Sequence, residues 1–120
     1  MARLLIVDDS RFMRTCLKEI WRETGLGHVY EAANGVEAIE QYQAFGPELV
    51  TMDITMPVMD GLEALRTLRA LHADARVLMI SSMGQQSLVR EALAYGAVGF
   101  VVKPFEPSSV LAEIRRALSP

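Results

Sequence analysis

The chain has 120 residues, of which 51% are hydrophobic and 22% are charged. This length fits one ordinary domain, and the apolar content favours a packed core over a disordered segment. Twelve basic and fifteen acidic residues give a formal net charge of −3, and no basic stripe indicates a nucleic-acid-binding protein. We therefore expect residues 1–120 to form a single globular domain.

The N-terminal segment lacks the features of a secreted or membrane-inserted chain. The apolar run from Leu4 to Val7 is short and is followed at once by Asp8 and Asp9. Such a run is too short for a signal peptide or a membrane span. Cys16 is the only cysteine, so an internal disulfide is excluded. We expect a cytoplasmic protein without membrane insertion, in which Cys16 is buried as a small hydrophobe on a helix.

Strand-like and helical segments alternate along the chain. Five short apolar runs are predicted strands, namely Leu4–Val7, Val29–Ala33, Leu49–Met52, Val77–Ile80 and Val98–Val102. Three of these runs are apolar on both faces, which is typical of parallel strands covered by helices on each side. The second run is more polar, and we expect it to lie at an edge of the sheet.

The segments between the runs have helical periodicity. The first forms the apolar stripe Phe12, Met13, Cys16, Leu17, Ile20 and Trp21. Later segments give the stripe Leu62, Leu65, Leu68 and Leu71 and the stripe Val110, Leu111, Ile114, Ala117 and Leu118. Candidate helix N-caps are Asn34, Asp60 and either Asp9 or Ser10. Gly25, Gly46 and Gly96 stand where helices are expected to end.

The fivefold alternation of strand and helix predicts an α/β fold with a parallel sheet and right-handed crossovers. Five strands fit the flavodoxin-like, doubly wound (βα)5 sandwich with the strand order 2-1-3-4-5. In that arrangement ligands bind at the carboxyl ends of strands 1 and 3. The fold therefore predicts where a functional site lies.

Polar residues follow four of the five predicted strands. Asp8 and Asp9 follow the first, Asp53 the third, Ser81 and Ser82 the fourth, and Lys103 with Pro104 the fifth. Taken singly, these residues have ordinary explanations as helix caps, loop residues or surface charges. Because the carboxyl ends of parallel strands share one edge of the sheet, we expect all of them to converge there.

Three carboxylates in one crevice repel each other. Two unit charges about 4 Å apart cost roughly 4 kcal/mol at an effective dielectric constant of 20. A hard divalent cation such as Mg²⁺ (or Mn²⁺) offsets this repulsion with oxygen ligands. Together with Lys103, it would balance the charges of Asp8, Asp9 and Asp53. Such a site is ready to receive an anionic phosphoryl group, whose oxygens accept hydrogen bonds from serine hydroxyls.

The chain resembles the receiver domain of two-component response regulators. The matching motifs are Ile6-Val7-Asp8-Asp9-Ser10, the segment from Asp53 to Gly61, Ser81-Ser82 and Lys103-Pro104-Phe105. The resemblance extends from about Arg3 to Leu118. Within the family the chain is most similar to single-domain chemotaxis receivers, and the stretch from Ser81 to Gln86 resembles the form found in Gram-positive and related bacteria.

The resemblance implies a phosphorelay reaction. Asp53 would be the phosphoacceptor and would attack the phosphohistidine of a sensor histidine kinase. Lys103 and the hydroxyl of Ser81 would contact phosphoryl oxygens, and the backbone at Thr55 and Ser82 would add further contacts. The protein would not be a conventional enzyme, although it would catalyse its own phosphorylation and dephosphorylation.

The resemblance also implies the ligands of the cation. Asp9 and Asp53 would bind Mg²⁺ directly, and Asp8 would bind it through a water molecule. The backbone carbonyl of Thr55 would be a further ligand. Thr55 and Met83 flank the crevice at positions that tune the lifetime of the acyl phosphate, and their expected effects are opposite.

A switch is implied as well. Phosphorylation would draw Ser81 inward, Phe100 would follow, and the surface formed by the fourth helix, fifth strand and fifth helix would change its partner affinity. Many chemotaxis receivers have Tyr at the position of Phe100, so the hydrogen bond of that hydroxyl is missing here. Candidate residues of the partner surface are Met83, Gln86, Val89 and Phe100. The implied partners are a histidine kinase, a flagellar motor switch protein and a phosphatase, and we expect a monomer that binds no nucleic acid.

Three alternatives to a freestanding chemotaxis receiver remain. The chain could be the receiver part of a longer regulator with another output. It could be a small phosphohydrolase with Asp53 as nucleophile, because Asp53-Ile54-Thr55 has some likeness to haloacid dehalogenases, although these place the nucleophile on the first strand. A flavin-binding electron carrier of the same fold is disfavoured because Asp8 and Asp9 would repel the flavin phosphate.

Overall fold

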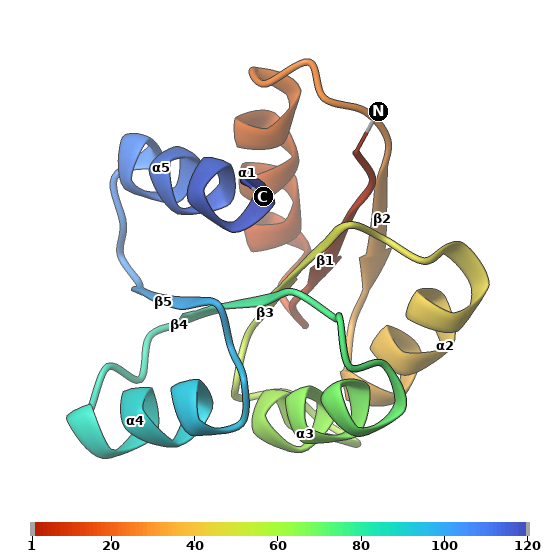
Figure 1. The fold of residues 1–120 in the computed structure, drawn as a ribbon. Coiled ribbons are helices and arrows are strands. Elements are labelled where there is room, and N and C mark those ends of the chain that lie inside the picture. Colours follow the sequence, from red (N-terminus) through yellow and green to blue (C-terminus); the bar gives the residue numbers. More distant parts are fainter. Residues whose placement is uncertain (1, 120) are drawn as a thin grey trace.

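A computed structural model describes residues 2–119, in which five strands and five helices alternate (Figure 1). The strands are β1 (Leu4–Val7), β2 (Val29–Ala32), β3 (Leu49–Met52), β4 (Val77–Ser81) and β5 (Gly99–Val102). The helices are α1 (Arg11–Arg22), α2 (Gly35–Phe45), α3 (Gly61–Leu71), α4 (Gln86–Ala94) and α5 (Pro107–Leu118). The strands pair in parallel in the order β2-β1-β3-β4-β5. The predicted flavodoxin-like (βα)5 fold is confirmed, and the polar strand β2 lies at an edge as expected.

The sheet lies between two layers of helices. In Figure 1, α1 and α5 cover one face of the sheet, and α2, α3 and α4 cover the other. Successive side chains of β1 point to opposite faces of the sheet. Leu4 and Ile6 pack with α1 and α5, and Leu5 and Val7 pack with the opposite layer. This double coverage explains why the central strands are apolar on both faces.

The strand register brings the predicted site residues to one edge. Val7 pairs with Met52 across β1 and β3, so Asp8 and Asp53 follow neighbouring strands at the same level. The backbone N–H of Asp53 donates to the carbonyl of Val7 at 3.0 Å. At the other side of the sheet, Lys103 follows β5, and its N–H donates to the carbonyl of Ser81 at 2.8 Å.

The helix caps agree with the sequence prediction. The Ser10 hydroxyl accepts from the N–H of Met13 at 3.2 Å, and Asn34 and Asp60 cap α2 and α3 in the same way. Ser10 rather than Asp9 therefore caps α1. This choice leaves the Asp9 carboxylate outside the helix.

Several sequence expectations are wrong in detail. Two members of the predicted apolar stripes are exposed, Phe12 to 75% and Leu71 to 55%. These residues lie in the first turn of α1 and the last turn of α3, and a helix of 11 or 12 residues is longer than the four-residue strands that it covers. Cys16 is half-buried rather than buried.

The strand ends also differ from the prediction. Strand β2 ends at Ala32 instead of Ala33, β4 continues to Ser81, and β5 begins at Gly99 instead of Val98. Pairing of Ser81 with Val102 extends β4 by one residue, so a residue expected to follow the strand is part of it. Within residues 2–119, no helix has the length and apolar content that a membrane crossing requires.

Thr51 is a polar residue in the middle of the central strand β3. It is 1% exposed and is flanked by Ile6 of β1 and Leu78 of β4. Its hydroxyl has no hydrogen-bond partner within the described part of the chain. A buried hydroxyl without a partner costs stability, because it loses its bonds to water on folding.

We predict that Thr51→Val raises the free energy of unfolding by about 1 kcal/mol, because valine removes the unsatisfied group at similar volume. Chemical denaturation followed by circular dichroism measures the change. Thr67→Val is the matched control, since the Thr67 hydroxyl donates to the carbonyl of Glu63 at 2.9 Å and its loss brings no such gain. A loss of stability in Thr51→Val would show that the hydroxyl is satisfied in solution.

Candidate functional site

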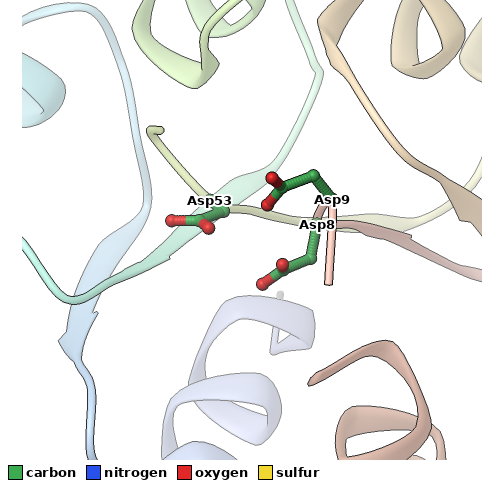
Figure 2. A group of neighbouring side chains, drawn as sticks. All are labelled: Asp8, Asp9 and Asp53. Atoms are coloured by element: carbon green, nitrogen blue, oxygen red, sulfur yellow. The ribbon is translucent and has the colours of Figure 1, made fainter. Parts of the chain in front are cut away.

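Three carboxylates meet at the carboxyl ends of β1 and β3. Asp8, Asp9 and Asp53 each place one oxygen within 4.8 Å of the others, and Figure 2 shows the three side chains gathered at this edge. Asp8 is 2% exposed and Asp53 is 8% exposed, whereas Asp9 lies on the surface. The cluster therefore has two buried acids and one that faces solvent.

Lys103 is the cation that meets this cluster. Its Nζ lies 2.8 Å from Oδ2 of Asp8 and 3.2 Å from Oδ2 of Asp53, and its side chain is 15% exposed. A single ammonium group thus bridges the two buried carboxylates. With three acids against one ammonium, the site keeps an excess of negative charge.

The pKa values at the site reflect this imbalance. Burial raises the pKa of Asp53, and although the charge of Lys103 opposes this, the charge of Asp8 adds to it. For Lys103, burial alone would lower the pKa, but the hydrogen bond to Asp8 and the charges of Asp53 and Asp8 outweigh burial and raise it. The ammonium of Lys103 is therefore held in its charged form, whereas the surroundings of Asp53 disfavour its ionised carboxylate.

Backbone N–H groups donate hydrogen bonds to the carboxylates of the two buried acids. Oδ1 of Asp8 accepts from the N–H of Ser10 at 2.9 Å, and Oδ1 of Asp53 accepts from the N–H of Ile54 at 2.8 Å. Together with Lys103, these bonds engage both oxygens of each carboxylate. No donor within residues 2–119 bonds the carboxylate of Asp9. Asp9 is therefore the acid best placed to meet a ligand from solvent.

The loop after Asp53 returns tightly against it. A Cβ at Gly61 would overlap the carbonyl group of Asp53, so only glycine allows α3 to begin this close. The N–H of Gly61 donates to the carbonyl of Ile54 at 2.8 Å. Val58, at the exposed tip of this loop, has a φ of 70°, which is unusual for a β-branched residue.

The residues after β4 form the side of the site next to Asp53. Ser81 is fully buried, and its Oγ accepts from the N–H of Met83 at 3.1 Å. The Thr55 hydroxyl donates to the sulfur of Met83 at 3.2 Å, which joins the loops after β3 and β4. Ser82 is exposed, and Phe100 is half-buried against the core beneath α3 and α4.

The four residues predicted for the partner surface differ in exposure. Gln86 is exposed, Val89 is half-buried, and the two line a shallow hollow on α4 together with Arg90. Met83 and Phe100 are half-buried and pack against the core. The structure thus places Gln86 and Val89 at this hollow, and Met83 and Phe100 at the boundary of the core.

Sequence reasoning missed one group that touches the site. The Arg14 Nη1 donates to the backbone carbonyl of Asp8 at 2.7 Å, and its Nε pairs with Glu31 of β2 at 3.0 Å. Lys18 also pairs with Glu31, at 3.0 Å. The spacing of Arg14 and Lys18 predicts only that they share one face of α1. No motif in the sequence indicates which backbone group that face meets.

The acid cluster fits a magnesium ion. The cluster offers carboxylate oxygens, which Mg²⁺ prefers, and Asp9 is exposed to the water molecules that this ion usually retains as ligands. The excess negative charge and the raised pKa of Asp53 mean that a bound cation would relieve an unfavourable state. Asp8, Asp9 and Asp53 are the side chains that would hold it.

Comparison with known proteins agrees with this geometry. The family model described as response regulator receiver domain matches residues 4–115. The chemotaxis protein CheY of Bacillus subtilis is 50% identical over 117 residues, covering 98% of both chains, and CheY of Thermotoga maritima is 46% identical over 114 residues, covering 95% of both. In the crystal structure of a CheX-CheY-BeF3-Mg²⁺ complex from Borrelia burgdorferi, the matching chain has a TM-score of 0.95 and 37% identity, covering 99% of this chain and 90% of that one. The chain belongs to the response regulator receiver domain family.

Proposed function

We propose that this chain is a two-component receiver of the chemotaxis type, in which Asp53 accepts a phosphoryl group and thereby changes protein binding. Residues 1–120 act in this proposal as one receiver domain. The observation that carries it is the bridge from Lys103 to Asp8 and Asp53 beside the open carboxylate of Asp9. The extensive identity to CheY proteins supports chemotaxis as the pathway.

In the proposed transfer, an oxygen of Asp53 attacks phosphorus, and the bond between phosphorus and the imidazole nitrogen of a kinase histidine breaks. The imidazole leaves with the electron pair of that bond and takes up a proton. Such transfers need little covalent help, and catalysis consists mostly of positioning and of neutralising the oxygens of the moving group. Lys103 lies against Asp53 already, so it can shift to a phosphoryl oxygen without crossing the site.

Mg²⁺ (or Mn²⁺), when bound, supplies the remaining positive charge. Asp9 and Asp53 would hold it directly, Asp8 through water, and the backbone carbonyl of Thr55 would complete the protein ligands. Asp8 is also the more buried of the two acids that Lys103 bridges, at 2% exposed against 8% for Asp53, which fits its less direct role.

Ser81 and Phe100 form the proposed switch. The Ser81 oxygen accepts from Met83, so its own proton is available for a phosphoryl oxygen. The backbone at Ser82 and Thr55 would bond the same group. Ser81 and Phe100 lie on the same face of neighbouring strands, and Phe100 is only half-buried, so it has room to move inward when Ser81 moves. The surface around Met83, Gln86 and Val89 would then change its affinity.

The proposed partners follow from chemotaxis. A sensor histidine kinase supplies the phosphoryl group, a flagellar motor switch protein reads it, and a phosphatase removes it in addition to the self-catalysed loss. The Borrelia structure contains CheX in complex with CheY, which supports a partner of that kind. We propose a cytoplasmic monomer that binds no nucleic acid and does not insert into membranes.

The first prediction from the proposed function concerns the acceptor. Incubation with Mg²⁺ and acetyl phosphate is expected to add one phosphoryl group, which intact mass spectrometry detects and hydroxylamine removes. Asp53→Asn is expected to add none, because the amide is not a nucleophile. Asp74→Asn, an exposed acid remote from the cluster, is the control and should behave as wild type. An adduct that persists in Asp53→Asn would refute the assignment.

The second prediction concerns the loss of folding stability that the acid cluster causes. Because the folded state raises the pKa of Asp53, the ionised carboxylate destabilises the fold above that pKa, and this cost fades as the pH falls from the raised pKa to the lower pKa of the unfolded chain. Without metal at neutral pH, Asp53→Asn should therefore unfold at a higher temperature than wild type.

Mg²⁺ should raise the unfolding temperature of wild type, and this rise should shrink in Asp53→Asn and Asp9→Asn. Differential scanning calorimetry with and without Mg²⁺ measures both effects. An equal rise in all three proteins would exclude these two residues as ligands.

The third prediction concerns the switch. Phe100→Ala should change the affinity for a motor switch fragment at least about fivefold more in the beryllofluoride-activated protein than in the unmodified one. Titration calorimetry provides both affinities. Phe45→Ala, which lies at the end of α2, is the control and should have equal effects in both states. Equal effects of Phe100→Ala would mean that Phe100 is only a packing residue.

A further inference from the structure

The turn that carries the acid pair is held by its backbone. The N–H of Asp8 donates to the carbonyl of Ala32 in β2 at 3.1 Å. Its carbonyl accepts from Nη1 of Arg14 in α1 at 2.7 Å. Asp9 comes next in the chain, and within residues 2–119 nothing donates to its carboxylate. The position of that carboxylate therefore depends on how firmly the backbone of Asp8 is held.

Arg14 is itself oriented by the edge strand. Its side chain is only 17% exposed, and its Nε lies 3.0 Å from Oε1 of Glu31. The other oxygen of Glu31 accepts from Lys18 at 3.0 Å. Partial burial alone would raise the pKa of Glu31, but its bonds to Lys18 and Arg14 outweigh burial and lower it, so the carboxylate stays ionised. Arg14 thus links Glu31 of β2 to the carbonyl of Asp8 through two different nitrogens.

We propose that Arg14, oriented by Glu31, is a positioning residue for the cation site. It fixes the carbonyl of Asp8 and thereby sets where the Asp9 carboxylate meets the ion. The inference rests on the proposed function, because it assumes that the acid cluster binds Mg²⁺. Arg14 touches neither the ion nor the phosphoryl group, and it acts only through the backbone of the turn.

The positive charge of Arg14 and its hydrogen bond to Asp8 have opposite expected effects on the affinity for Mg²⁺. As a positive charge near the acid cluster, Arg14 repels a cation, so its removal alone would tighten Mg²⁺ binding. As a positioning residue, it favours binding, so its removal would weaken it. Replacement by lysine separates the two roles further, because an ammonium keeps the charge but lacks the planar fork that spans Asp8 and Glu31.

The test is the dissociation constant of Mg²⁺, measured by titration calorimetry on the full chain. Arg14→Gln is expected to weaken binding about tenfold, as is common when a group that orients a metal ligand is lost. Arg14→Lys should weaken it to a similar extent. Glu31→Gln should give a smaller loss, because Arg14 remains but is held less firmly.

Lys18→Gln is the matched control. It removes the other ion pair of Glu31 but leaves the bond from Arg14 to Asp8, so Mg²⁺ affinity should be unchanged or slightly higher. Circular dichroism melts without Mg²⁺ report the general stability of each variant. If Arg14→Gln does not fold, Arg14→Lys and Glu31→Gln still decide the outcome.

Two results would overturn the inference. Wild-type affinity in Arg14→Lys would show that only charge matters. Unchanged or tighter binding in Arg14→Gln, with or without a lower unfolding temperature, would show that Arg14 has no positioning role. Absence of Mg²⁺ binding by the wild type would instead refute the proposed cation site, and so separates that failure from this one.

Discussion

Repulsion among three carboxylates is the constraint on which the rest of this molecule depends. Asp8, Asp9 and Asp53 lie within 4.8 Å of one another, and one ammonium group meets them. Lys103 bridges the two buried acids, where water screens least, and the third faces solvent. The fold retains a cluster whose charge repulsion costs stability, as functional sites often do. Under the proposed function, its charges are arranged before a cation or phosphoryl group binds.

Side chains that repel one another move apart unless the backbone that carries them is fixed. Here three contacts fix the main chain around the acids. The Ser10 cap begins α1 directly after the acid pair, Gly61 lets α3 press against the carbonyl of Asp53, and Arg14 bonds the carbonyl of Asp8. Each contact acts on backbone atoms and leaves the carboxylate oxygens of the three acids near one another. The sheet alone, with strands that end just before these residues, would not restrain them so closely.

The location of the site was predictable because it follows from topology. Asp8, Asp53 and Lys103 each come directly after an apolar run, and parallel strands place such residues at one edge. Helical periodicity was less informative, since it shows which face of a helix is apolar but not where the sheet beneath it ends, as Phe12 shows. The contacts of Arg14 with Asp8 and of Thr55 with Met83 join side chains to partners whose placement no spacing encodes.

The bridge made by Lys103 also bears on how the chain folds. Lys103 is 95 residues from Asp8 and 50 from Asp53 along the sequence, and these are the two largest separations among the side-chain hydrogen bonds of residues 2–119. Contacts of such separation form late, because the entropy of loop closure opposes them until the intervening structure is in place. A chain whose fifth strand has not docked holds the acids without their counter-ion. Under the proposed function, the site is therefore complete only when β5 has docked onto the sheet.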